Sequence, residues 1–131
     1  MAIQTNEYVS SATIAAHPSI EPQTVQPKKF AAGTALLKVG TPVAFDTATD
    51  NWKVWDFDGT NGNDTISGIV FPEDIQLLAG GEVIGPVMLQ GKIAYTSVTL
   101  PSPETEANMK TALRTGPRAL GIIVSGLDQV V

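Results

Sequence analysis

Apolar and polar residues alternate in short runs along most of the chain, and residues that favour turns separate the runs. Such runs are typical of β-strands, because successive side chains on a strand point to opposite faces of its sheet. From Lys28 onward they recur about every 8 to 12 residues, which predicts a small β-sandwich or β-barrel. The predicted strands are Ala35–Val39, Pro42–Phe45, Trp52–Trp55, Thr65–Phe71, Glu82–Ile84, Pro86–Leu89, Lys92–Tyr95, Val98–Leu100 and Ala119–Val124.

One segment has a helical pattern instead. Apolar residues between Met109 and Leu113 recur at three-to-four spacing, which gives a helix one narrow apolar face. Ser102 is the predicted N-cap, with Pro103 at the first helical position. The Gly-Pro pair at 116–117 is expected to end the helix. The pattern therefore predicts a mostly β fold with one short α-helix.

The first 27 residues differ in pattern from the rest. They contain no Lys or Arg, only two acidic residues and three prolines, and their apolar residues occur singly. Such a segment buries too little apolar surface to offset the conformational entropy of ordering, about 1–2 kcal/mol per residue. We predict an extended N-terminal arm over residues 1–27, disordered alone and ordered on a partner, and a β-rich domain over residues 28–131. A flexible leader without a partner is the alternative.

Composition and charge exclude several classes of protein. The chain has 131 residues, a net charge of −5 and no cysteine. Disulfide-stapled scaffolds and cysteine zinc sites both need cysteines, and nucleic-acid binding needs clustered cations that this sequence does not have. The chain does not begin with the basic residues and apolar run of a signal peptide. No apolar run approaches the length of about 18 residues that a membrane span needs. We therefore expect neither nucleic-acid nor membrane binding.

Few residues are candidates for catalysis or metal binding. The only histidine, His17, lies in the arm, where nothing positions it for catalysis. Counted from Asp56, the sixth and twelfth positions hold Asn61 and Ser67, where a helix-loop-helix calcium site needs Gly and Glu. Turn formation therefore explains the composition of the loop Asp56–Asp64. The carboxylates considered for hydrolysis of glycosidic bonds are Asp46, Asp56 and Glu73. Carboxylates in turns are usually solvated, so we expect no catalytic residue, no metal and no cofactor.

Trp52 and Trp55 are the largest apolar side chains in the chain. A spacing of three on a strand places them on opposite faces of the sheet. One is expected in the core, and the other is expected either half-exposed or at a subunit contact, where Trp is favoured. Both therefore remain candidates for a subunit contact.

Several short motifs follow one another in a fixed order from Thr41 to the end of the chain. They are carried by Thr41, Pro42, Asp46, Trp55, Asp56, Gly59, Thr60, Gly68, Ile69, Gly91, Pro103, Glu104 and Gly121–Ile123. This order resembles that of the lambda-type head decoration proteins of tailed bacteriophages, which also have a Ser/Thr/Pro-rich leader. The likeness covers Thr34 to Val131. Two extra residues before Gly59, and Leu100-Pro101 in place of a Trp-Pro pair, depart from the family pattern.

The resemblance implies a capsid decoration, or cement, protein with a β-clip or barrel-like domain. Family members form trimers on the outside of the expanded head, at three-fold and quasi-three-fold positions, and stabilise it against internal DNA pressure. The implied partners are the major capsid protein and two further copies of the chain. The implied location is the outer surface of the virion head, after synthesis in the cytoplasm of the host bacterium.

The resemblance also gives the arm a function. An arm that adds to capsid strands through main-chain hydrogen bonds needs few specific side chains. The expected anchors are Ile3, Thr5, Tyr8 and Val9. A β-rich surface module that binds a glycan or receptor on a virion or fibre is the alternative function, and it would need an exposed aromatic platform. A small hydrolase would need clustered carboxylates.

Overall fold

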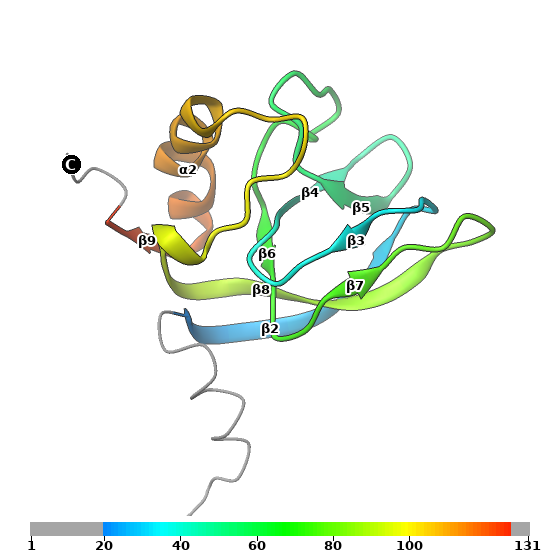
Figure 1. Cartoon of the computed structure of the whole chain (residues 1–131), viewed down its shortest axis with the longest axis horizontal. Coiled ribbons are helices and arrows are strands. Elements are labelled where there is room, and N and C mark those ends of the chain that lie inside the picture. Colours follow the sequence, from blue (N-terminus) through cyan, green and yellow to red (C-terminus); the bar gives the residue numbers. More distant parts are fainter. Residues whose placement is uncertain (1–19, 127–131) are drawn as a thin grey trace, which may run out of the picture.

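Strands dominate the part of the chain that the structure describes. The computed structural model describes residues 20–126, and only the backbone of 115–120. The elements are β2 (Ile20–Phe30), β3 (Leu36–Leu37), β4 (Pro42–Asp46), β5 (Asn51–Val54), β6 (Gly68–Val70), β7 (Ile75–Gln76), β8 (Val83–Ala94), the 3₁₀-helix η1 (Tyr95–Ser97), α2 (Glu106–Leu120) and β9 (Ile122–Ser125) (Figure 1). The prediction of a mostly β fold with one short α-helix is confirmed.

Six of these strands form one sheet that closes on itself. Their order is β2-β5-β4-β6-β8-β9, and β2 also pairs with β8, so the first five strands of that order form a barrel. β8 pairs antiparallel with β2 and β6, and it pairs parallel with β9. β3 and β7 form a separate two-stranded sheet. Of the two predicted architectures, the described residues form the barrel.

Apolar side chains pack on both faces of this sheet. Because neighbours on a strand point to opposite faces, Ile69 and Met88 belong to one buried cluster and Val70 and Val87 to another. α2 completes the first cluster, and β3 and β7 complete the second. The two clusters cover different parts of the sheet, and Val25 of β2 and Ile84 of β8 remain exposed.

The boundary predicted after Pro27 falls inside a strand and is wrong as a structural break. β2 begins at Ile20, which is 2% exposed and lies in the core, and it pairs with β8 along its whole length. Residues 20–27 therefore belong to the sheet. The prolines that favoured an arm are compatible with β2 because one of its edges is open, and a missing N–H on that side breaks no ladder. Residues 1–19 lie outside the described residues.

The helix begins later and ends later than the sequence pattern predicts. α2 starts at Glu106, and the predicted cap Ser102 lies in a turn before it. Thr105 is the N-cap, since its hydroxyl oxygen accepts a hydrogen bond from the Asn108 N–H at 3.2 Å. The Gly-Pro pair at 116–117 does not end the helix. A proline removes one helical hydrogen bond, and packing of α2 against β9 and the core outweighs that loss.

Three strands predicted between Glu82 and Tyr95 form the single strand β8. The turns expected at Gly85 and Gly91 are absent from it. A Cβ at Gly85 would lie 2.5 Å from the Ile75 side chain, and a Cβ at Gly91 would lie 2.5 Å from the Glu21 carbonyl oxygen. These glycines therefore permit close packing of neighbouring elements rather than turns.

The predicted strand Val98–Leu100 is also absent. This segment follows η1 and makes isolated contacts in place of a ladder: the Thr99 N–H donates to the Gly40 carbonyl at 2.9 Å, and the Thr99 hydroxyl donates to the Val39 carbonyl at 2.8 Å. Single bonds of this kind fix a loop, and they do not extend a sheet.

Candidate interaction surface

The arm residues expected to bind a partner lie outside the described residues. They are Ile3, Thr5, Tyr8 and Val9, and His17 lies outside as well. The described chain begins at the buried residue Ile20, which is opposite Ile93 of β8. The chain that follows the predicted anchors is therefore fixed in the sheet from its first described residue.

Two shallow hollows border β2. The first, which we name the Trp52 hollow, has a volume of about 420 Å³ and is lined by Thr24, Gln26, Trp52, Ser67, Leu89 and Gln90. The second, the Ile84 hollow, has a volume of about 390 Å³, and its lining includes Val25, Gln26, Pro27, Pro72, Ile84 and Pro86. Gln26 lines both, so the two hollows meet at β2.

The Trp52 hollow has a neutral, mixed surface. Trp52 is half-buried, with Phe45 at 5.9 Å between ring centroids and the Lys28 Nζ 5.6 Å from its ring centroid. Thr24 donates a hydrogen bond to the Gln90 side chain at 2.8 Å. Apolar contact with Trp52 and neutral hydrogen-bonding groups are therefore available side by side in this hollow.

Trp55 has a different environment from Trp52. It is 1% exposed, and its indole N–H donates to the Asp64 carbonyl at 3.1 Å. The prediction that one of the two Trp residues lies in the core is confirmed for Trp55. Trp52 is half-buried in the described chain. Trp55 offers no surface to a second subunit, whereas a subunit contact at Trp52 stays a prediction.

The Ile84 hollow lies in an exposed apolar patch on the β2–β8 pair. Ile84 is 73% exposed and Val25 is 38% exposed. Near these two residues, Pro27 of β2 lies opposite Pro86 of β8. Contiguous apolar patches of this kind on a small protein mark interaction sites more often than single exposed apolar residues do.

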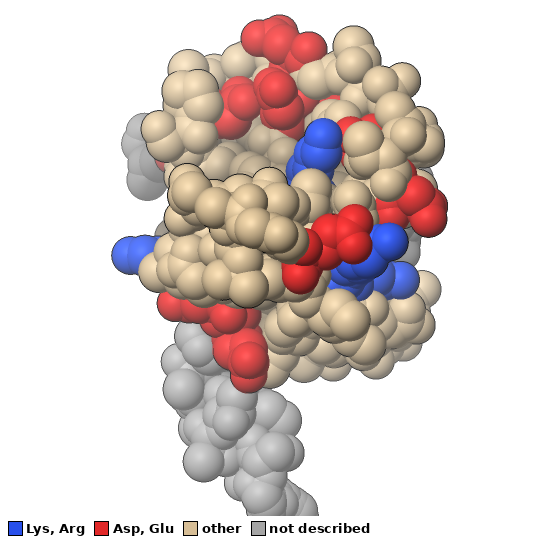
Figure 2. Space-filling view, turned by 90° about the vertical axis from the view of Figure 1, so that its right-hand side faces the viewer, with Lys and Arg blue, Asp and Glu red and all other residues tan. Residues whose placement is uncertain are grey.

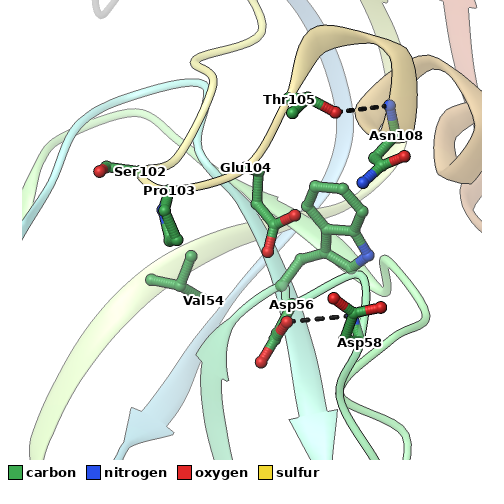
Figure 3. Close-up of a pocket in the computed structure, with 9 residues that line it drawn as sticks. Val54, Asp56, Asp58, Ser102, Pro103, Glu104, Thr105 and Asn108 are labelled. Atoms are coloured by element: carbon green, nitrogen blue, oxygen red, sulfur yellow. Dashed lines mark hydrogen bonds between the residues drawn. The ribbon is translucent and has the colours of Figure 1, made fainter.

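A third hollow contains carboxylates. It has a volume of about 370 Å³ and lies between the Asp56–Asp64 loop and the segment that precedes α2 (Figure 3). The Asp56 carboxylate accepts a hydrogen bond from the Asp58 N–H at 3.1 Å, and Glu104 accepts one from the Phe57 N–H at 3.2 Å. These bonds hold the loop and join it to the segment before α2, so the fold itself gives these carboxylates a role.

Asp46 is a buried carboxylate at the end of β4. Its Oδ2 lies 2.8 Å from the Lys53 Nζ, and its Oδ1 accepts a hydrogen bond from the Ala48 N–H at 2.8 Å. These two bonds hold the pKa of Asp46 far below its usual value near 3.8, and the bond from Lys53 has the larger effect. Asp46 therefore fixes the turn between β4 and β5, while Glu73, the other carboxylate considered, is exposed beside the Ile84 hollow.

The loop Asp56–Asp64 forms turns, as predicted. Asn61 has φ 58° and Gly62 has φ 90°, and the Thr47 N–H donates to the Asn61 carbonyl at 2.9 Å. Asn and Gly are the residues that adopt this left-handed conformation most easily. Among residues 20–126, no three His, Cys, Asp or Glu side chains come close enough together to hold a metal ion.

Charged side chains of both signs share the face drawn in Figure 2. On that face the basic side chains lie near acidic ones and do not form a separate basic patch. Within residues 20–126, Lys53 forms an ion pair with Asp46 at 2.8 Å, and Lys29 forms one with Glu82 at 3.9 Å. Within the described part of the chain, no helix has the length and apolar character to cross a membrane.

Comparisons with known proteins do not identify a family. A scan against models of protein families finds no match, and a search of curated proteins finds none either.

The sequence pattern did not indicate the two hollows or the edge between them. The pattern assigns residues 20–27 to the arm, so it does not place Val25 and Pro27 on a folded surface. The signal was present in Pro22 and Pro27, because prolines within an otherwise strand-like segment are typical of an edge strand.

Proposed function

We propose that this chain is a capsid decoration protein of a tailed bacteriophage. It binds the major capsid protein on the outside of the expanded head, as a homotrimer at three-fold and quasi-three-fold positions. The N-terminal segment, residues 1–19, makes the primary attachment. The bound trimers join neighbouring capsid subunits and stabilise the head against internal DNA pressure.

The residues that carry the resemblance support this proposal through their positions. Trp55 and Ile69 are buried in the core. A Cβ at Gly68 would lie 2.4 Å from Val87, so no larger residue fits there without a shift. Gly121 has φ 99°, which favours glycine. Because such residues determine a fold, their shared order favours a fold shared with the head decoration proteins, and this is the observation that carries the proposal.

The alternative of a glycan-binding module depends on an open aromatic face. Trp52 is the aromatic residue that lines a hollow beside β2, but Lys28 lies over its ring and Phe45 lies beside it. Sugars stack on open ring faces, so this arrangement favours attachment to a protein over attachment to a glycan.

Removal of residues 1–19 tests the proposal. The chain of residues 20–131 keeps β2 whole, whereas a deletion that extended to Val25 would remove part of the sheet. We expect the shortened chain to fold and to lose saturable binding to expanded, undecorated heads, because trivalent attachment through the arms is lost. Co-sedimentation with the heads measures binding, and circular dichroism with thermal unfolding checks the fold.

A matched control keeps the length of the arm. In the full chain, replacement of Ile3, Tyr8 and Val9 by Ser should weaken binding strongly without any deletion. Equal binding by the full chain and by residues 20–131 would contradict the proposed role of the arm.

A further inference from the structure

β2 has one paired edge and one open edge. It pairs with β8 from Ile20 to Phe30, whereas on its other side it meets β5 only where Phe30 pairs with Trp52. No other strand of residues 20–126 lies beside that second edge. In Figure 1, β2 lies at the lower border of the described residues, with β8 directly above it.

The backbone groups of Val25 and Pro27 point to the open edge. Along two antiparallel strands, pairs of opposite residues that exchange two backbone hydrogen bonds alternate with pairs that exchange none. Pro27 is opposite Pro86, and neither has an N–H, so this pair exchanges none. In agreement, the Pro86 carbonyl accepts a hydrogen bond from the Phe71 N–H at 3.5 Å, on the side of β8 away from β2.

Val25 follows the same rule because it lies two residues from Pro27 with no bulge between them. Its N–H and C=O, together with the Pro27 C=O, therefore form a short row of backbone groups on the open edge. Gln26, between them, directs its backbone groups to β8. The edge is thus a template for one added strand, with a single well-defined donor at Val25.

The two hollows flank this row of backbone groups. Thr24 and Gln26 line the Trp52 hollow on one side of β2, and Val25 and Pro27 line the Ile84 hollow on the other. Successive side chains of an added strand would point alternately to these two sides. Pro27 and the basic pair Lys28-Lys29 discourage unspecific edge pairing, so only a strand that fits the hollows is favoured.

We propose that the open edge of β2 binds an extended segment of the capsid subunit by β-addition at Val25–Pro27. This inference rests on the proposed function. In the sequence, β2 follows directly after residues 1–19, which the proposed function attaches to the capsid subunit, so the open edge is the first part of the folded domain after the attached segment. The bound segment carries small or apolar side chains at alternate positions for the two hollows. It carries an acidic residue where it passes Lys28 and Lys29.

The variant Val25→Pro tests the edge in the full-length chain. It removes the N–H that points away from β8 and leaves the hydrogen bonds between β2 and β8 in place, and proline is tolerated on strand edges. We expect its binding to expanded, undecorated heads to be about tenfold weaker than that of the unchanged chain, with the same unfolding temperature. Val25→Thr, which keeps the N–H and the branched shape, should bind like the unchanged chain. Gln26→Pro removes an N–H directed at β8 and should lower the unfolding temperature.

Hydrogen exchange of the unchanged chain gives a second readout that does not depend on any variant. The Val25 amide should exchange faster than the Gln26 amide in the free chain, and it should become protected when heads are added. A Val25 amide that is protected in the free chain, or unprotected on the heads, overturns the inference.

The outcomes separate the inference from the proposed function. If the unchanged chain does not bind heads, both fail. If it binds and Val25→Pro binds equally well, only the inference fails. If Val25→Pro abolishes self-association in sedimentation and leaves head binding unchanged, the edge binds a second copy of the chain, and the inference is again overturned.

Discussion

Asp46 stabilises the fold through its charge. It is 3% exposed, and Lys53 and the Ala48 N–H both bind its carboxylate. These bonds favour the ionised form and hold its folded-state pKa below the usual value near 3.8. A carboxyl with a depressed pKa in the folded state stabilises the protein at pH above its unfolded pKa, and this stabilisation is lost as the pH falls below it.

Replacement of Asp46 by Asn should lower the unfolding temperature at pH 7. Below about pH 4 the carboxyl of the unfolded chain is protonated, so the difference between the unchanged chain and Asp46→Asn should narrow from pH 7 to pH 3. Thermal unfolding across this range measures the difference. Asp58→Asn, which removes an exposed carboxylate of the next loop, is the control for the loss of one negative charge. A difference that stays constant with pH contradicts the role given to Asp46.

At the scale of elements, α2 depends on its cap and on its packing. Thr105 caps the helix, and Met109 and Leu113 place it on the core. Packing against β9 and the core also accounts for the continuation of the helix through the Gly-Pro pair at 116–117. The start of α2 is therefore determined by one hydroxyl group and its length by tertiary contacts.

Thr105→Ala should destabilise the protein by about 1 kcal/mol, because the Asn108 N–H loses its acceptor. Ser102→Ala is a matched control at the position that the sequence pattern predicts as the cap, and it should change stability by less than about 0.5 kcal/mol. Urea unfolding measures both. A larger loss for Ser102→Ala than for Thr105→Ala would contradict the observed start of the helix.

The sequence pattern predicts features that depend on local alternation and fails where distant contacts decide. It predicts the strand near Pro42–Phe45, the turn at Asn61-Gly62 and the division of Trp52 and Trp55 between surface and core. It cannot show that Gly85 packs against Ile75, so it divides β8 into pieces. It also assigns residues 20–27 to an arm, because their burial depends on β8, which lies far along the chain.

The candidate surface could be predicted only in part. The spacing of Trp52 and Trp55 predicts that the two side chains lie on opposite faces, since strand geometry separates those faces, but it does not tell which of the two is in the core. The open edge at Val25 does not follow from local pattern, because an edge is defined by which strands are absent beside it. The Pro27–Pro86 pair, which orients that edge, is likewise a contact between distant residues.

At the scale of the whole molecule, apolar side chains remain exposed at several places on the surface. Ile84 is 73% exposed, Leu78 is 54% exposed and Ile123, on β9, is 51% exposed. A chain that functions in an assembly can leave such surface for its neighbours to cover. The net charge of −5 is compatible with the proposed position on the outside of a capsid head, away from packaged nucleic acid.

The most direct test of the central claim is an image of heads incubated with the protein. Expanded, undecorated heads are mixed with the full-length chain at saturating concentration, and the decorated heads are reconstructed by electron cryomicroscopy. We expect added density at the three-fold and quasi-three-fold positions of the outer surface, with three copies of the β-rich domain at each. Heads without added density, or with density at other positions only, would contradict the central claim.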